Sequence, residues 1–207
     1  MDWFLARIGR PTASCFDQLL TPTGKPSSSA REYLGVLMAE RLTGEPYETW
    51  EGTVWMRRGD ELQDQARAAY TLRTGIEVRT AGLCYRDESR MVAGSPDGLA
   101  DPDGGLEIKC PKPGRHIGWL AKGELPPEHA WQVYGNLWIT GRRWWDFVSY
   151  HPALPLFVVR CAPDPDRFAA LESAIDRFLA DLAELRARLS DLGYAETIGM
   201  TPEQPAA

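Results

Sequence analysis

The sequence of 207 residues has no apolar run near the roughly 20 residues that a membrane-spanning helix needs. Its opening residues, MDWFLARIGRPTAS, also lack the apolar segment of a secretory signal. These two absences predict a soluble, cytoplasmic protein without membrane contact.

Cysteine is scarce, and the four cysteines stand apart from one another at Cys15, Cys84, Cys110 and Cys161. No C-x-x-C pair occurs, so the local spacing of a zinc ribbon or an iron–sulfur cluster is missing. We therefore expect reduced, partly buried thiols.

A basic excess is missing as well. The chain has 23 Lys and Arg against 29 Asp and Glu, which gives a net charge of -6. Nucleic-acid-binding domains usually have the opposite balance. The charge argues mildly against bulk electrostatic binding of nucleic acid, but a local basic patch can oppose the mean charge.

Neither an internal repeat nor a domain linker is visible, and we expect a single domain over residues 1–207. Apolar residues at helical spacing predict helices over 30–42, 54–74, 127–140 and 164–190. The first two should stop at Gly44 and Gly75, and Asp164 with Pro165 suits the start of the last. Residues 195–207 are predicted to form a loose tail.

Strands are predicted in the middle of the chain. Short extended runs fit IEV, GLCYR and MVAG, between residues 76 and 94. Residues 97–109 fit a hairpin turned at DPDGG, and WWDFVSY and LFVVRC fit two further strands. Helices before and after a consecutive set of strands predict an α/β (α+β) fold, with a mixed central sheet flanked by helices.

Three residues of the predicted hairpin have chemistry that converges. In LEIKC the strand period of two puts Glu107 and Lys109 on one face. The DPDGG turn folds the chain back, so Asp97 on the preceding strand can approach Glu107 on the same side. Two carboxylates at a sheet suit a hard cation such as Mg²⁺, and a lysine beside them can orient water or stabilise charge on a phosphate. The pattern predicts metal-dependent phosphodiester hydrolysis.

For an isolated D-x9-E-x-K pattern, a solvent-facing hairpin with a weak surface ion pair would be the better interpretation. The flanking sequence changes this balance. YRDESRMVAGSPDGLADPDGGLEIKCP resembles the signature of the bacteriophage lambda exonuclease family, phage recombination 5′→3′ exonucleases of the PD-(D/E)xK superfamily. RIGRPTAS is similar to the family's R-x-G-x-x-T-A-S segment, and AWQVYGNLWITGRRWWDFVSYHP to its glutamine-containing helix and aromatic strand. The motifs occur in the family's order, which implies a restriction-endonuclease-like core.

The resemblance implies catalytic roles. Asp97 and Glu107 would bind Mg²⁺, or Mn²⁺, as one or two ions per site, with the backbone carbonyl of Ile108 as a further ligand. Lys109 would position the attacking water. Gln132 would lie against the catalytic strand, although without the resemblance it would be an ordinary polar residue of an amphipathic helix.

The sequence departs from the family at Gln63, where the family usually has a glutamate. Glutamine can accept a hydrogen bond through its carbonyl but brings no negative charge, so the second ion, or the affinity for the first, is in question. Asp87 occupies a position where the family often has an acid, and we expect at most an indirect role for it.

A second group of residues is expected to contact DNA. Arg7 and Ser14 match residues that hold the 5′-terminal phosphate, which suits an arginine fork and a hydroxyl donor. Without the resemblance, Ser14 would be a helix cap and Arg7 a surface charge. Lys112, Arg115 and His116 follow the catalytic strand closely and favour a DNA-facing patch over a solvated basic loop.

Other conspicuous residues have structural interpretations. Arg142 and Arg143 fit a helix C-terminus, where cations complement the helix dipole. Trp131, Trp138, Trp144 and Trp145 follow helix and strand faces, which favours a core or a subunit interface over base stacking.

The resemblance implies an exonuclease that digests one strand of linear double-stranded DNA from a 5′-phosphorylated end and leaves a 3′ single-stranded tail. It also implies a ring-shaped homotrimer, a single-strand annealing protein as partner, and a phage or prophage protein in the bacterial cytoplasm. The alternatives are a restriction-like endonuclease, a RecB-type repair nuclease, and a DNA-binding protein with a decayed site. The Arg7 and Ser14 pair argues against a restriction-like endonuclease. The missing cysteine cluster argues against the iron–sulfur forms of a RecB-type nuclease. The intact Asp97, Glu107 and Lys109 argue against a decayed site.

Overall fold

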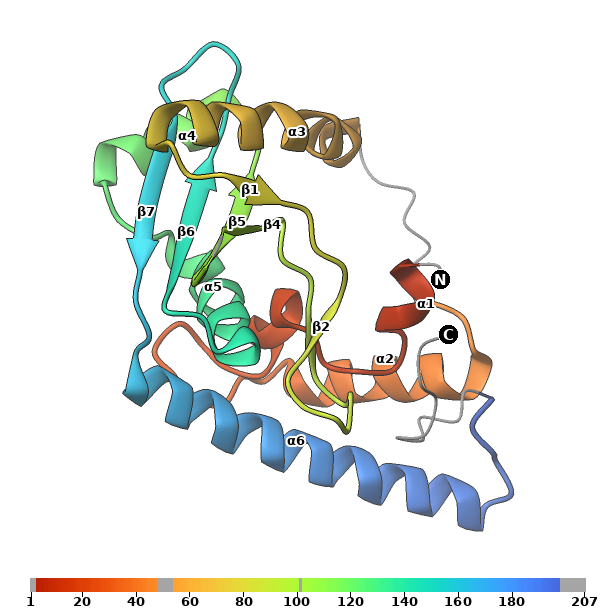
Figure 1. Cartoon of the computed structure of the whole chain (residues 1–207). Coiled ribbons are helices and arrows are strands. Elements are labelled where there is room, and N and C mark those ends of the chain that lie inside the picture. Colours follow the sequence, from red (N-terminus) through yellow and green to blue (C-terminus); the bar gives the residue numbers. More distant parts are fainter. Residues whose placement is uncertain (1–2, 48–53, 101, 198–207) are drawn as a thin grey trace.

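The computed structural model describes residues 3–47, 54–100 and 102–197. Its central sheet has five strands in the order β1 (Val78–Arg79), β4 (Gly98–Ala100), β5 (Gly104–Lys109), β6 (Trp144–Ser149) and β7 (Phe157–Cys161). β5 and β6 are parallel, and the other neighbours are antiparallel (Figure 1). The sheet is therefore mixed, as the sequence predicted.

Helices cover both faces of this sheet. Ala66 and Tyr70 of α3 (Val54–Thr74) pack on one face, against Leu106, Ile108 and Val148. The opposite face packs against α4 (Pro113–Lys122) and α5 (Pro127–Thr140), through the buried side chains Trp119, Val133, Leu137, Trp145 and Phe147. Alternate residues of β6 thus point into two different core clusters, whereas Leu106 and Ile108 of β5 point into the cluster beneath α3.

A second region lies beyond one end of the sheet (Figure 1). It contains α1 (Trp3–Arg7), the 3-10 helix η1 (Ala13–Gln18), α2 (Ala30–Thr43) and α6 (Pro165–Asp191). The short strands β2 (Cys84–Tyr85) and β3 (Ala93–Gly94) form a separate antiparallel pair, and an isolated bridge joins Ala93 to Thr12. The sequence predicted these two strands as extended but did not predict that they form a second sheet.

The helix boundaries confirm the terminal signals in the sequence. α2 ends immediately before Gly44, and α3 ends immediately before Gly75. Asp164 caps α6, because its Oδ1 accepts hydrogen bonds from the backbone N–H groups of Asp166 and Arg167, both at 3.1 Å. The capped start favours helix formation since it satisfies donors that have no partner inside the helix.

The structure adds two features that the sequence did not predict and corrects one expectation. Helix α4 directly follows the catalytic strand and begins at Pro113, a residue that suits the first helical position. Arg142, which follows the end of α5, donates from Nη1 to the carbonyls of Ala100, Pro102 and Gly104, and thereby holds the β4–β5 hairpin. The loose tail does not start at residue 195, because the backbone N–H of Thr197 donates to the carbonyl of Arg41 at 3.0 Å. Residues 198–207 lie outside the described residues.

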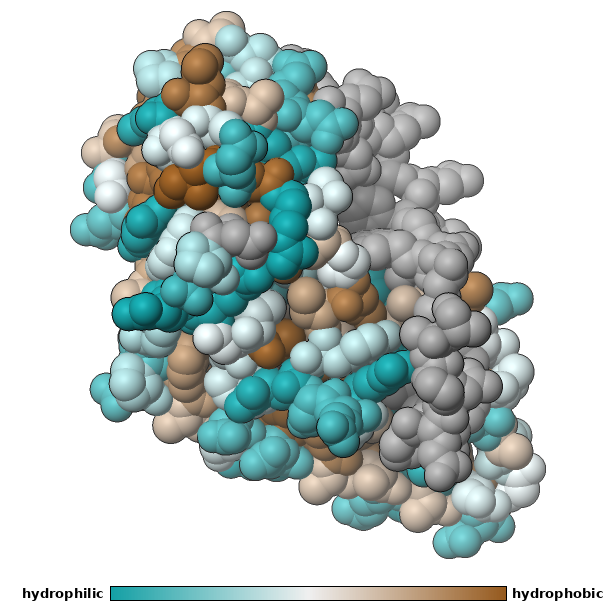
Figure 2. All heavy atoms as spheres, viewed as in Figure 1, coloured by the Kyte–Doolittle hydropathy of each residue, from teal (hydrophilic) through white to brown (hydrophobic). Residues whose placement is uncertain are grey.

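The tryptophans mainly build the core, as predicted. Trp131, Trp138 and Trp145 are buried, whereas Trp144 is partly buried beneath the guanidinium of Arg160, 3.8 Å from its ring centre. On the face shown in Figure 2, hydrophobic residues form small areas divided by hydrophilic ones. Within the described part of the chain, no helix has the length and apolar character needed to cross a membrane.

We expect Gly105→Ala to destabilise the sheet, because a Cβ at Gly105 would lie 2.2 Å from Cζ3 of the fully buried Trp145. Overpacking of this kind costs about 1–3 kcal/mol of unfolding free energy, which urea denaturation can measure. Gly118→Ala on α4 is the control, since its Cβ would meet open space and alanine favours a helix by about 0.5–1 kcal/mol. Equal stabilities for the two variants would contradict this packing.

Candidate active site

The register of the β4–β5 hairpin places the two carboxylates opposite each other. Gly98 pairs with Leu106, so the next step along the antiparallel register sets Asp97 opposite Glu107. The backbone N–H of Asp97 donates to the carbonyl of Leu106 at 3.2 Å, which continues the ladder to this position. The turn therefore brings Asp97 back beside Glu107, as the sequence predicted.

Lys109 shares a face of β5 with Glu107. Its Nζ lies 2.8 Å from Oε1 of Glu107, and the Glu107 side chain is only 1% exposed. Leu106 and Ile108 point to the other face and pack against α3. The predicted alternation along LEIKC is confirmed.

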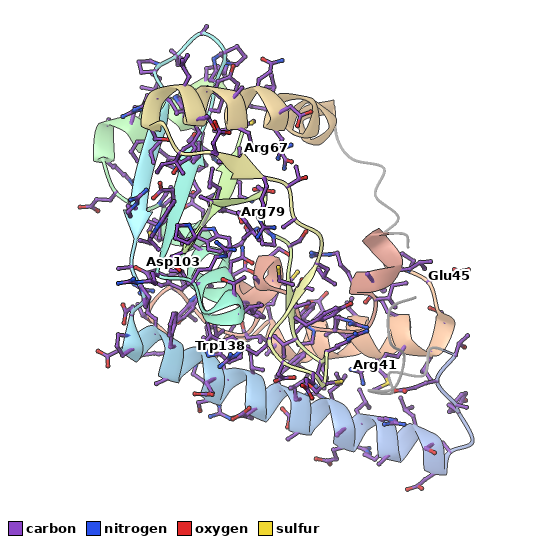
Figure 3. All side chains as sticks on the ribbon, in the orientation of Figure 1. Arg41, Glu45, Arg67, Arg79, Asp103 and Trp138 are labelled. Atoms are coloured by element: carbon purple, nitrogen blue, oxygen red, sulfur yellow. The ribbon has the colours of Figure 1, made fainter. Side chains whose placement is uncertain are left out.

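Asp97 is fixed by contacts on both carboxylate oxygens. Oδ2 accepts a hydrogen bond from the backbone N–H of Ile108 at 2.6 Å, and Oδ1 accepts one from Nε2 of Gln63 at 3.1 Å. Arg67, one turn further along α3, donates from Nη1 to the backbone carbonyl of Asp97 at 2.8 Å. Figure 3 shows Arg67 projecting from α3 toward the sheet. Gln63, whose role the sequence left in question, thus contacts Asp97, whereas no pattern in the sequence indicated Arg67.

Asn136 is a further residue that the sequence analysis missed. It is fully buried, and its Nδ2 donates to Oε2 of Glu107 at 3.2 Å. Asn136 lies one helical turn after Gln132 on α5, and both residues line the same cleft. The i, i+4 spacing from Gln132 was a signal that could have indicated Asn136.

The cleft has a volume of about 870 Å³ and joins the hairpin residues to the N-terminal region. Residues with proposed catalytic roles line it, namely Asp97, Glu107, Ile108, Lys109 and Gln132. Arg7, Ser14 and Arg115 line it as well. The structure thus brings residues that are 100 positions apart in the sequence into one cavity.

Arg7 and Ser14 are in direct contact within this cleft. Nη2 of Arg7 donates to Oγ of Ser14 at 2.7 Å and to Oγ1 of Thr12 at 2.9 Å. Ser14 lies inside η1 and does not cap it, because the N-cap position belongs to Thr12. The pair therefore presents a guanidinium and hydroxyl groups together, which is the donor set that a phosphate group prefers.

Three predicted residues lie away from the cleft lining. His116 is fully buried, with Nδ1 2.7 Å from Oγ of Ser149 and Nε2 3.0 Å from the carbonyl of Pro155, so its position is structural. Asp87 lies in the β2–β3 turn, where its Oδ1 accepts hydrogen bonds from Ser89. Lys112 is exposed and precedes α4.

Burial controls the electrostatics of the hairpin residues. It raises the pKa of Glu107 to about 8, against the opposing effect of Lys109 and with a further upward contribution from Asp97. Burial also raises the pKa of Asp97, although Lys109 lowers it. Burial disfavours the charged form of Lys109, but Glu107 and Asp97 outweigh this and raise its pKa. Both carboxylates can be ionised at the same time only if positive charge lies close to them.

The residues present fit a divalent cation. Oε1 of Glu107 is buried and faces the ammonium group of Lys109, whose Nζ lies 2.8 Å away. In an antiparallel pair the N–H and C=O of a residue face the same neighbour, so the Ile108 carbonyl faces the side of Asp97. Two carboxylates and a carbonyl supply the oxygen ligands that Mg²⁺ prefers. Over the described residues, no group of three or more His, Cys, Asp or Glu side chains could hold a metal ion, and the hairpin itself supplies two carboxylates.

A mixed sheet in which Asp97, directly before β4, lies opposite Glu107 and Lys109 of β5 defines a DNA nuclease of the PD-(D/E)xK class. The chain belongs to the YqaJ-like viral recombinase domain family, whose model matches residues 2–143 and so includes every residue of the hairpin site. Comparison with curated proteins gave no match.

Solved structures show the same relationship. The chain is similar to an alkaline exonuclease, LHK-Exo from Laribacter hongkongensis, with 35% identity, a TM-score of 0.84, and coverage of 93% of this chain and 97% of that one. LHK-Exo in complex with dAMP matches with 36% identity and a TM-score of 0.82 over 92% and 98% of the two chains. A phage-related exonuclease from Haemophilus somnus 129PT shares the fold, with 14% identity, a TM-score of 0.67, and coverage of 87% and 96%. The family model and the two LHK-Exo structures confirm the resemblance to the lambda exonuclease family.

We expect the affinity for Mg²⁺, measured by calorimetry, to rise with pH and to level off above about 8, the pKa of Glu107. The reason is that protons and the cation compete for the same carboxylate oxygens. Lys109→Met should move the midpoint to higher pH, because Lys109 lowers the pKa of both carboxylates. Lys122→Met, at an exposed site on α4, should leave it unchanged. An identical midpoint in all three proteins would show that these carboxylates do not bind the ion.

Proposed function

We propose that this chain is a Mg²⁺-dependent 5′→3′ exonuclease that digests one strand of linear double-stranded DNA and leaves a 3′ single-stranded tail for recombination. The observation that carries the proposal is a single cleft that contains both the Asp97, Glu107 and Lys109 group and the Arg7 and Ser14 pair. The names of the relatives support it, since LHK-Exo is an alkaline exonuclease and one of its structures contains dAMP, a nucleotide of the kind that this reaction releases.

The carboxylates of Asp97 and Glu107 and the carbonyl of Ile108 would hold Mg²⁺, or Mn²⁺, which accepts similar oxygen ligands. A bound divalent cation lowers the pKa of water and neutralises charge on the scissile phosphate. Asn136 holds Oε2 of Glu107 and Gln63 holds Oδ1 of Asp97, so both carboxylates enter the reaction in fixed orientations. Because Gln63 is uncharged, the site supplies two negative side chains, and the number of ions it binds is one or two.

We assign to Lys109 the positioning of water in the hydrolytic step. Its raised pKa keeps the ammonium protonated, so Nζ is a donor of hydrogen bonds at neutral and alkaline pH. In this role Lys109 orients the water that attacks phosphorus and stabilises the negative charge that develops on the phosphate oxygens. Gln132 lines the same cleft, and its amide can hold a phosphate or a water.

Recognition of the DNA end is assigned to Arg7 and Ser14. A guanidinium with an adjacent hydroxyl suits a terminal phosphate, which has more charge than a phosphodiester. A strand held there by its 5′ end would be cut near that end, which makes the enzyme an exonuclease. Arg115 lines the cleft and Lys112 is exposed nearby in sequence, so both suit contacts with the phosphate backbone.

Family membership supports the assembly and the setting of this activity. We infer a homotrimer that encircles DNA, a single-strand annealing protein as the recombination partner, and a phage or prophage enzyme that acts in the cytoplasm of a bacterial host. Sedimentation with and without duplex DNA tests the trimer independently of catalysis.

The experiment uses linear duplex DNA with a 5′-phosphate on one labelled strand and a 5′-hydroxyl on the other, beside a closed circle of the same sequence. We expect Mg²⁺-dependent loss of the phosphorylated strand from its 5′ end, no loss in EDTA, and an intact circle. Lys109→Ala should lower kcat by about 100-fold or more, as loss of a transition-state donor does. Lys122→Ala, an exposed lysine on α4, should leave kcat unchanged.

Two outcomes would overturn the proposal. Cleavage of the circle would assign the protein to the endonucleases of the same class. Digestion from the 3′ end, or equal activity of the wild type and Lys109→Ala, would contradict the roles assigned to the cleft.

A further inference from the structure

The turn between α1 and η1 sets the geometry of the Arg7 and Ser14 pair. Arg7 is the last residue of α1, and its guanidinium reaches across the turn to Thr12 and Ser14. Gly9 lies in the middle of this turn, with a positive φ of 69°. Any shift of Gly9 therefore changes the distance between the guanidinium and the two hydroxyl groups.

The end of α2 holds Gly9 from both sides. The backbone N–H of Gly9 donates to Oε2 of Glu40 at 2.7 Å, and its carbonyl accepts from Nε of Arg41 at 2.7 Å. A Cβ at Gly9 would lie 2.5 Å from Cγ of Arg41, so the two residues are in close contact. Figure 3 shows Arg41 on α2, in the region below α1.

Arg41 is a buried charge that needs compensation. Its side chain is 4% exposed, and the acid paired with it is Glu196, whose Oε1 lies 3.7 Å from Nη1 of Arg41. Burial lowers the pKa of Arg41, Glu196 raises it, and Arg186 and Arg10 lower it. Without Glu196, the Arg41 guanidinium would lie near two other cations, Arg186 and Arg10. Removal of one partner from a buried ion pair strongly destabilises a protein, because the remaining charge is left uncompensated.

Glu196 is itself fixed by the segment that follows α6. The side chain is 10% exposed, and Oε1 also lies 3.4 Å from Nε of Arg186 on α6. The next residue, Thr197, donates from its backbone N–H to the carbonyl of Arg41 at 3.0 Å and from Oγ1 to the carbonyl of Leu42 at 2.5 Å. This segment thus forms a strap across the end of α2.

We propose that Glu196 is a positioning residue for recognition of the 5′ end: through Arg41 it fixes Gly9, and through Gly9 the contact between Arg7 and Ser14. The inference rests on the proposed function, because it requires that Arg7 and Ser14 bind a terminal phosphate. It assigns a specificity role to a segment about 190 residues distant from Arg7 in the sequence.

The test compares kcat/KM for duplex DNA with a 5′-phosphate and with a 5′-hydroxyl. In Glu196→Gln the ratio of the two values should fall about tenfold, the change that corresponds to about 1.4 kcal/mol of lost binding. The loss should appear in KM for the phosphorylated duplex. Glu184→Gln, the same change at an exposed site on α6, should retain the wild-type ratio.

A merely structural role for Glu196 would lower activity on both duplexes equally and leave the ratio unchanged, which would overturn the inference. If Glu196→Gln does not fold, the Arg41→Lys variant provides the test instead. Lysine keeps a cation for Glu196, but unlike a guanidinium it cannot contact Glu196 and the Gly9 carbonyl at the same time. A wild-type ratio in folded Arg41→Lys would also overturn the inference.

The same assay separates this inference from the proposed function. A wild type that does not discriminate between the two duplexes would refute end recognition at Arg7 and Ser14, and the inference with it. A wild type that prefers the phosphorylated duplex, together with a Glu196→Gln variant that prefers it equally, would refute only the role of Glu196.

Discussion

The close approach of two carboxylates, the partly buried Asp97 and the buried Glu107, is the constraint on which the site depends. The antiparallel register of β4 and β5 imposes it, and Arg142 reinforces it by binding three carbonyls of the hairpin. Burial makes ionisation of both groups unfavourable, so the fold must supply positive charge and hydrogen-bond donors around them. The protein alone does not fully balance the negative charge of the two carboxylates, and a bound divalent cation would do so.

The surrounding elements can be understood as support for this pair. α3 contributes Gln63 and Arg67 on the side of Asp97, whereas α5 contributes Asn136 on the side of Glu107. β5 itself contributes Lys109 and the backbone N–H of Ile108. Because the helices pack on opposite faces of the sheet through separate core clusters, each can orient one carboxylate without displacing the other.

Local signals in the sequence were sufficient for the main elements and for the centre of the site. The period of two along LEIKC, the DPDGG turn, and the glycines that end α2 and α3 each depend on a few neighbouring residues. Long-range contacts could not be derived in this way. Three examples are the hydrogen bonds from Arg142 to the hairpin, the contacts that bury His116, and the ion pair of Arg41 with Glu196. Each joins residues between about 30 and 155 positions apart in the sequence, and no local pattern encodes contacts over such separations. Asn136 lies between these two cases. Its spacing from Gln132 could be seen in the sequence, but its hydrogen bond to the buried Glu107 could not.

We infer that Asp97, Glu107 and the Ile108 carbonyl form one cation site, on which the proposed reaction depends. Anomalous diffraction from crystals grown with Mn²⁺ tests it most directly, because Mn²⁺ shares the ligand preferences of Mg²⁺ and can be located by its own scattering. We expect an anomalous peak bonded to both carboxylates and to the Ile108 carbonyl. A peak at other residues, or none at the hairpin in crystals where Mn²⁺ supports DNA cleavage, would contradict it.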